Sequence, residues 1–95
     1  MIGHVVMFKF HKRSSSEDRE HALFLLRRMP EVVPSIKEWQ IGQQYVYSEK
    51  RWDIVEIATF DNEEELDLFQ SSSMHKELTT HMKKISDWHA VDFTY

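Results

Sequence analysis

Apolar and polar residues alternate along residues 2–11, and this alternation is the pattern of a β-strand. Alternate positions place two sets of side chains on opposite faces: His4, Val6, Phe8 and Phe10 on one, and Val5, Met7 and Lys9 on the other. Both sets contain apolar side chains, whereas a strand with one wetted face carries them mainly on its buried side. The pattern therefore predicts a strand with both faces at least partly covered.

A first helix is predicted after this strand. Residues 14–18 offer serine hydroxyls that can cap a helix, followed by Glu17 and Asp18, whose carboxylates favour the positive end of the helix dipole. Apolar residues then recur at helical spacing, at Ala22, Leu25, Leu26 and Met29. Pro30 and Pro34 are expected to bracket the end of this helix.

A second helical region begins at residues 61–65, where acidic residues again provide the chemistry of a helix start. The three serines at 71–73 are expected to interrupt it. A further helix then follows, because apolar residues recur at helical spacing, at Met74, Leu78, Met82 and Ile85.

Three more strands complete the predicted fold. Residues 36–47, 52–60 and 88–95 are rich in β-branched and aromatic residues, with a polar turn at 48–51. The resulting β-α-β-β-α-β order is a split βαβ arrangement in a single domain, residues 1–95, of the α+β class. Helices cover one face of such a sheet, and the apolar residues on its other face favour a second copy. We therefore expect a homodimer that closes a barrel by two-fold symmetry.

Composition narrows the possible functions. The chain has 95 residues, no cysteine, a formal net charge of −4 and 13% aromatic residues. Without clustered Lys and Arg it is not expected to bind nucleic acid, and no apolar run is long enough to span a membrane. Its N-terminal segment lacks the features of a secretory signal, so a cytoplasmic location is expected. With two glycines and no helical histidine pair, neither a nucleotide cofactor nor a metal is expected.

Several segments resemble the stress-responsive A/B barrel domain family, called Dabb. They are residues 4–10 (HVVMFKF), 34–36, 52–69 (WDIVEIATFDNEEELDLF), 74–75 and 91–95. The resemblance covers essentially the whole chain, and the order and spacing of the segments make it specific. It implies a dimeric α+β barrel with a ferredoxin-like protomer, which agrees with the pattern above. It implies little about activity, since most members have no known reaction.

The resemblance also implies which residues of this chain form a site. The catalytic histidine of a plant polyketide cyclase in the family falls on His75, its supporting acid on Asp92 and its strand-one histidine on His4. The catalytic tyrosine of that enzyme falls on Phe69, and the first histidine of its H-P-x-H loop falls on Ser72. Because these two polar groups are missing, the cyclase reaction is not carried over to this chain.

His75 and Asp92 can be assessed from their chemistry. A carboxylate that accepts one imidazole N–H orients the ring and raises its basicity, which suits a general base near neutral pH. Asp92 can meet His75 if residues 88, 90 and 92 face the helices. Alternatively, Asp92 caps the last helix or pairs with a lysine, and His75 is solvated.

The remaining candidates are a buried acid and a set of apolar residues. Glu56 joins His4, His75 and Asp92 if its side of the third strand faces the helices, and otherwise it lies at a wet rim; the sequence leaves both open. The apolar candidates for lining a ligand cavity are Val6, Phe8, Phe24, Phe69 and Trp88, although such residues usually form core.

Two functions therefore remain open. One is a homodimeric, stress-linked or small-molecule-binding barrel of unassigned activity, with no cofactor and a small apolar ligand. The other is a cofactor-independent enzyme acting on a small apolar carbonyl or polyketide-like compound, with His75 as general base and Asp92 as its orienting partner. The first predicts that Phe69 and Trp88 fill the interior; the second predicts a pocket that reaches His75.

Overall fold

The computed structural model describes residues 1–46 and 48–95. The elements follow the predicted order, with two separate helices in the second helical region: β1 (Ile2–Phe10), α1 (Ser16–Val32), β2 (Glu38–Gln43), β3 (Ile54–Phe60), α2 (Glu63–Ser71), α3 (Ser73–Ile85) and β4 (Ser86–Thr94). Tyr47, the last residue of the predicted second strand, lies outside the described residues. No helix in the described part of the chain is long and apolar enough to span a membrane.

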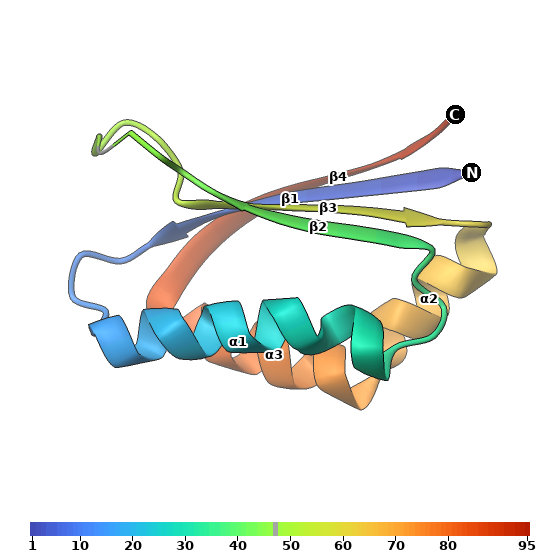
Figure 1. The fold of residues 1–95 in the computed structure, drawn as a ribbon, viewed down its shortest axis with the longest axis horizontal. Coiled ribbons are helices and arrows are strands. Elements are labelled where there is room, and N and C mark those ends of the chain that lie inside the picture. Colours follow the sequence, from blue (N-terminus) through green and yellow to red (C-terminus); the bar gives the residue numbers. More distant parts are fainter. Residues whose placement is uncertain (47) are drawn as a thin grey trace.

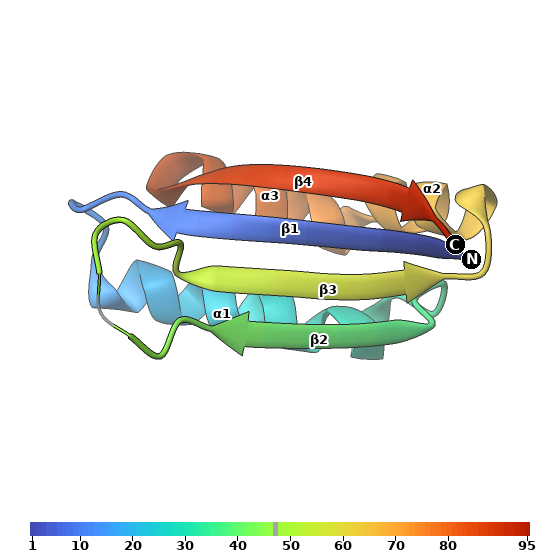
Figure 2. The ribbon, with the colours of Figure 1, turned by 90° about the horizontal axis from the view of Figure 1, so that it is seen from above.

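The four strands form one antiparallel sheet in the order β2-β3-β1-β4 (Figure 2). Within residues 1–46 and 48–95, all three helices lie on the same side of this sheet, as Figure 1 shows, and none of them covers its other face. The predicted arrangement of a sheet with helices on one face is therefore confirmed.

Serine and asparagine side chains begin the helices. Ser15 accepts a hydrogen bond from the backbone N–H of Asp18 at the start of α1, and Asn62 accepts one from Glu65 at the start of α2. The serine run separates α2 from α3 as predicted, because Ser72 both ends α2 and caps α3. Such a cap satisfies backbone N–H groups that have no partner within the helix.

Three predicted strand starts are corrected by the register. β2 begins at Glu38 and β3 at Ile54, each two residues later than expected, whereas β4 begins at Ser86 and not at residue 88. Ser86 is paired because it lies opposite Phe10, the last residue of β1. A strand starts where a neighbouring strand offers partners, which local composition does not reveal.

The core lies between the sheet and the helices. Its fully buried large side chains come from both layers: Leu25, Leu26, Met29, Phe60, Phe69 and Met82. On β1 the buried residues alternate as predicted, with Val6 and Phe8 facing the helices and Met7 facing away. One face of each central strand therefore packs into this core.

The opposite face of the sheet is also apolar, although no helix packs on it. Its side chains include Val5, Met7, Val55, Ile57, Val91 and Phe93, several of them well exposed. Val5 lies opposite Ile57 on β3 and Val91 on β4, so these three form a continuous row across the sheet. We call this surface the outer face. Contiguous exposed apolar surface on a small domain is typical of a binding interface.

Pro30 does not bracket the exit of α1 as expected, since it lies inside the helix. A proline has no N–H, so the carbonyl of Leu26, four residues earlier, lacks its helical partner. The indole Nε1–H of Trp39 donates to this carbonyl at 2.9 Å instead. A side chain of β2 thus completes the hydrogen bonding of α1, and the proline is tolerated in the helix.

This contact gives a first prediction. Replacement of Trp39 by Phe leaves the Leu26 carbonyl without a donor and is expected to lower the free energy of unfolding by about 1–3 kcal/mol. The Pro30→Ala substitution supplies a backbone N–H at that position. Trp39→Phe should therefore lower the free energy of unfolding by less in the Pro30→Ala background. Urea unfolding of the four proteins measures the difference, and an equal cost in both backgrounds would show that the indole bond is unimportant.

Candidate functional site

His4 lies at the centre of a polar cluster within the apolar core. It is on β1, directly opposite Asp92 on β4, while Glu56 on β3 lies opposite the next helix-facing residue of β1, Val6. The strand register therefore brings all three polar side chains to the same face of the sheet. This settles the orientation of Glu56, which the sequence left open: it faces the helices.

The imidazole of His4 lies between the two carboxylates. Its Nδ1 is hydrogen-bonded to Oδ1 of Asp92, and its Nε2 is 3.0 Å from Oε2 of Glu56. His4 is 5% exposed and Glu56 2%, whereas the side chain of Asp92 is 43% exposed. The Glu56 contact is an ion pair by distance, but its geometry is not that of a hydrogen bond, and Oε2 of Glu56 has no hydrogen-bond partner among the described residues.

Opposing effects act on the pKa of His4. Burial by itself lowers the pKa of the imidazole, but the adjacent Glu56 and Asp92 carboxylates outweigh it and raise the pKa above the ordinary value of 6.5. The cationic form is thus favoured by a negatively charged carboxylate beside each ring nitrogen. A histidine held in this way can donate a proton to a group that replaces either carboxylate as its partner.

The raised pKa of His4 predicts a pH-dependent stability. The folded state binds the proton more tightly, so this contribution is complete below the unfolded pKa of 6.5 and is lost as the pH rises through the folded pKa. We expect the free energy of unfolding to decline over this window, which urea titrations from about pH 6 to about pH 9 would cover. Asp92→Asn should flatten the decline, because one of the acceptors loses its charge.

Asp87→Asn is the matched control, since Asp87 pairs with the exposed His11 and not with His4. It should leave the decline unchanged. A His4 ring that titrates below 6.5 in the folded protein, as followed by NMR, would contradict the charged cluster.

Phe69 separates His4 from His75. The Phe69 ring is fully buried and contacts both imidazoles edge-on, with ring centroids 5.7 Å from His4 and 4.8 Å from His75. Trp39 and Phe60 pack on the same phenyl ring. The side chain at the position of the family's tyrosine therefore fills the space between the two histidines.

His75 lies in the first turn of α3 and is half-buried. Its backbone N–H donates to Oγ of Ser72. Burial lowers the pKa of the imidazole below 6.5, the positive charge of His4 lowers it further, and a hydrogen bond with the backbone of Gln70 partly opposes both. The neutral form, which is the form that accepts a proton, is thus favoured at neutral pH.

The predicted pair of His75 and Asp92 is corrected by this geometry. The Asp92 carboxylate contacts His4, so it is the strand-one histidine that receives the orienting acid. The physical reason is register, because Asp92 is the cross-strand neighbour of His4 whereas His75 lies on a helix behind Phe69. The catalytic roles of His75 and Asp92 stay predictions.

The apolar candidates separate into two groups. Val6 and Phe8 are buried core residues, and Trp88 is partly buried against Phe8. Phe24 is corrected: it is 53% exposed, on the side of α1 away from the sheet, with the guanidinium of Arg28 over its ring. The helix buries a stripe through Ala22, Leu25, Leu26 and Met29, which points Phe24 to solvent.

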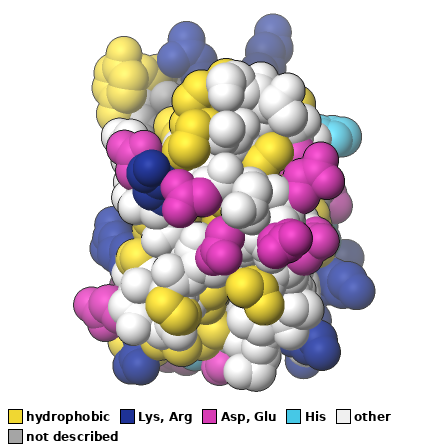
Figure 3. All heavy atoms as spheres, turned by 90° about the vertical axis from the view of Figure 1, so that its right-hand side faces the viewer, with side chains coloured by type: hydrophobic (Ala, Val, Ile, Leu, Met, Phe, Trp, Pro, Cys, Tyr) yellow, Lys and Arg dark blue, Asp and Glu magenta, His cyan; other side chains and the backbone are white. Residues whose placement is uncertain are grey.

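One surface groove reaches the cluster. It has a volume of about 650 Å³ and is lined from α2 and the ends of β1 and β4 by Ile2, Glu63, Leu66, Asp67, Gln70, Asp92, Phe93 and Thr94. Figure 3 looks onto this end of the molecule, where acidic side chains gather beside apolar patches. Asp92 is the member of the cluster that lines this groove, so it connects buried His4 with the surface.

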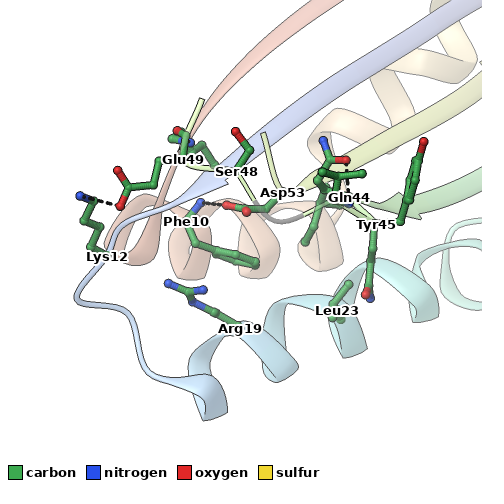
Figure 4. A pocket seen from close by; sticks show the side chains of 13 residues that line it. Phe10, Lys12, Arg19, Leu23, Gln44, Tyr45, Ser48, Glu49 and Asp53 are labelled. Carbon is green, nitrogen blue, oxygen red and sulfur yellow. Dashed lines mark hydrogen bonds and ion pairs between the residues drawn. The ribbon is translucent and has the colours of Figure 1, made fainter. Parts of the chain in front are cut away.

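A second groove lies at the opposite end of the sheet, beside the start of α1 (Figure 4). It has a volume of about 580 Å³ and contains several charged residues. These charges already have partners: Lys12 pairs with Glu49 at 3.3 Å, the Asp53 carboxylate accepts from the N–H of Phe10 at 2.7 Å, and Arg19 donates to Ser14. These charged side chains of the groove are thus already engaged in contacts within the protomer. Within residues 1–46 and 48–95, no three or more His, Asp or Glu side chains form a group that suits a metal ion.

The fold and the cluster define the class of protein. A four-stranded sheet in the order β2-β3-β1-β4, with helices on one face, is a ferredoxin-like α+β protomer. A family model described as Stress responsive A/B Barrel Domain (Dabb) matches residues 2–95, and the chain therefore belongs to the Dabb family. The resemblance noted in the sequence is confirmed.

Solved structures share the fold. A dimeric ferredoxin-like protein of unknown function from Thermobifida fusca superposes with a TM-score of 0.86 at 20% identity, over 99% of this chain and 90% of that one. A Dabb family protein from Mesorhizobium loti gives 0.78 at 13% identity, over 99% and 95%. A hydroxynitrile lyase from Passiflora edulis gives 0.83 at 13% identity, over 97% and 90%. At these identities the likeness shows the fold alone. A comparison with curated proteins finds no match.

Proposed function

We propose that this protein is a homodimeric barrel in which each protomer binds a small, largely apolar molecule through one polar group at the His4 cluster. The dimer is supported by the outer face, whose row of Val5, Ile57 and Val91 is covered by no helix in the described part of the chain. Two protomers related by a two-fold axis can bury this self-complementary apolar surface against each other. The similar proteins from Thermobifida fusca and Jannaschia are described as dimeric.

The single observation that carries the binding site is the buried, incompletely satisfied charge at Glu56. A buried ion pair contributes little net stability compared with apolar packing, and a buried carboxylate oxygen without a hydrogen-bond donor costs free energy. Oε2 of Glu56 is such an oxygen, beside a histidine that carries a proton. A ligand hydroxyl can supply the missing partner by donating to Glu56. A ligand carbonyl cannot, because it only accepts, but it can accept a hydrogen bond from the protonated His4.

The access route in this proposal is the groove lined by Asp92, since Phe69 fills the space on the other side of His4. Apolar groups of the ligand would contact Ile2 and Leu66 along that groove. The polar group would compete with Asp92 for the imidazole. Burial of an apolar ligand body with a few placed polar contacts is the usual design of small-molecule sites.

An NMR titration tests this proposal. The histidine ring signals are recorded while small aliphatic and aromatic aldehydes, ketones and alcohols are added. At least one compound is expected to shift the His4 signals saturably in the wild-type protein and to lose this effect in Glu56→Val. The exposed Glu77→Val variant on α3 is the matched control and should respond like the wild type.

If no compound shifts the His4 signals, or if Glu56→Val responds like the wild type, the cluster is a packing feature and the proposed site is wrong. Thermal unfolding of both variants verifies that they are folded during the titration.

A second candidate is a cofactor-independent lyase with His75 as general base. The observation that favours it is the lowered pKa of half-buried His75, which keeps an uncharged imidazole on one side of the Phe69 ring while His4 carries a proton on the other side. Such a pair can remove one proton and supply another, as cleavage of a cyanohydrin to a carbonyl compound and hydrogen cyanide requires. The Passiflora edulis protein with this fold is described as a hydroxynitrile lyase.

Cleavage of mandelonitrile tests this candidate directly. Release of benzaldehyde is followed by absorbance for the wild type, His75→Ala and His21→Ala; His21 is exposed on α1 and serves as the control. If the protein is such a lyase, the wild type and His21→Ala should cleave mandelonitrile faster than buffer alone. His75→Ala should show only the rate of the buffer. Equal rates in all three proteins would exclude His75 as the base.

A further inference from the structure

A third groove lies on the helix layer, between the C-terminal end of α1 and the junction of α2 with α3. Its volume is about 370 Å³, and its lining residues are Val32, Val33, Pro34, Ser35, Glu65, Leu68, Ser72, Ser73 and Met74. We call it the α1–α2 groove. It is separate from the His4 cluster, which lies on the sheet, and it lies on the opposite side of the molecule from the outer face. A dimer built on the outer face therefore leaves it open.

The walls of the α1–α2 groove are apolar. Leu68 is 58% exposed on α2 and Val32 is also exposed on α1, while Val33 and Met74 are buried and join the groove to the core. A volume of about 370 Å³ falls in the range of small-molecule sites, which begins at roughly 300 Å³. The groove thus presents apolar contact area on more than one side.

One polar atom of the groove is unsatisfied. Oγ of Ser35 is buried and has no hydrogen-bond partner among the described residues. Ser72, another of the lining serines, differs because its Oγ donates to the carbonyl of Phe69 at 2.7 Å and accepts from the N–H of His75 at 3.2 Å. An unpartnered buried hydroxyl costs free energy, and rotation about one side-chain bond can turn it toward a ligand.

The charge of the groove restricts its ligand. Of the described residues that line it, Glu65 alone carries a charge. It is partly buried at the start of α2 and repels an anion, and none of these side chains is cationic. An uncharged ligand with one hydroxyl fits best, because a hydroxyl can both donate to and accept from Ser35 while the rest of the molecule contacts Leu68 and Val32.

From these observations we infer that the α1–α2 groove is a second binding site, for a compact apolar alcohol whose hydroxyl bonds to Ser35. This site is independent of the proposed site at His4. The groove also lies beside Ser72, which caps α3. A bound ligand can therefore perturb the backbone N–H of His75 through its hydrogen bond to Ser72.

Three matched probes test the inference: benzyl alcohol, toluene and benzoate. Binding is followed through the methyl signals of Val32, Val33, Leu68 and Met74 and through the amide of His75. Benzyl alcohol should shift these signals saturably and bind more tightly than toluene, which lacks the hydroxyl. Benzoate should bind more weakly than benzyl alcohol, and Glu65→Gln should reduce that difference.

Ser35→Ala is the decisive variant. One hydrogen bond contributes about 0.5–1.5 kcal/mol, so benzyl alcohol should bind roughly 2- to 10-fold more weakly while toluene binding stays unchanged. Leu68→Ala should weaken the binding of both ligands, because it removes apolar contact area from one wall of the groove. Leu68 is exposed and Ser35 is small, so both variants are expected to fold, which thermal unfolding verifies.

The inference is overturned if no probe shifts these methyl signals, if the shifts lie on the outer face at Val5 and Val91 instead, or if Ser35→Ala binds benzyl alcohol as the wild type does. These readouts do not involve Glu56 or the ring of His4. Failure of the α1–α2 groove and failure of the His4 site are therefore distinguished by which signals respond.

Discussion

The Ile57→Lys variant is expected to be a folded monomer, in contrast to a dimeric wild type. Ile57 lies in the middle of the outer face, opposite Val5, and is exposed in the isolated protomer, so a lysine there does not disturb the core. In the proposed dimer it would place an uncompensated charge in a buried apolar interface in both copies. Burial of such a charge costs several kcal/mol, so dimerisation should weaken roughly a hundredfold or more.

Sedimentation equilibrium measures this effect against the chain mass of 11.5 kDa. Phe24→Lys is the matched control, since it places the same charge on an exposed apolar position of α1 on the helix layer. It should remain dimeric. If Ile57→Lys dimerises as tightly as the wild type, the outer face is not the interface.

Replacement of His4 by Leu is expected to lower the free energy of unfolding by about 3–5 kcal/mol, because it removes the cation between two carboxylates, one of them buried. The Glu56→Val substitution should also be destabilising, but by less, because His4 keeps the Asp92 carboxylate as a partner and can lose its proton. In the double variant most of the cost of His4→Leu should be recovered. Strong coupling between the substitutions is the expected signature of a buried ion pair.

Urea unfolding at pH 6, near the ordinary pKa of histidine of 6.5, gives the four free energies of this cycle. Replacement of the exposed His21 on α1 by Leu is the control and should change stability little. A cost of His4→Leu that is the same with and without Glu56 would mean that the two side chains do not interact.

Periodicity alone predicts most of this fold. The alternation along β1 identifies its buried and outer sides, and the serine caps locate the starts of α1 and α3 within a residue or two. These signals are local, because they reflect which neighbours share a face and which backbone N–H groups need a partner. The apolar residues on both sides of the strands likewise indicate a sheet that is covered on both faces.

The candidate site is less predictable because it depends on register. His4, Glu56 and Asp92 are each recognisable as candidates, but local sequence does not reveal that Asp92 lies opposite His4 and not beside His75. The exposure of Phe24 is hidden for a related reason: apolar residues occupy several consecutive positions of α1, and only packing shows which of them face the sheet.

Other features were not predicted at all. Trp39 completes the hydrogen bonding around Pro30, although the proline inside a helical pattern was the one available signal of a freed carbonyl. Ser35 gives no sign of a groove beyond its place after Pro34, because the groove is built from residues 32–35 and 65–74, which are far apart in the chain.

The central claim is that two protomers bury their outer faces against each other. The most direct test is an isotope-filtered NOE experiment on a dimer mixed from labelled and unlabelled chains. Contacts between chains are predicted among the methyl groups of Val5, Ile57 and Val91. A protein that is monomeric at micromolar concentration, or one whose contacts between chains lie on the helix layer, would contradict it.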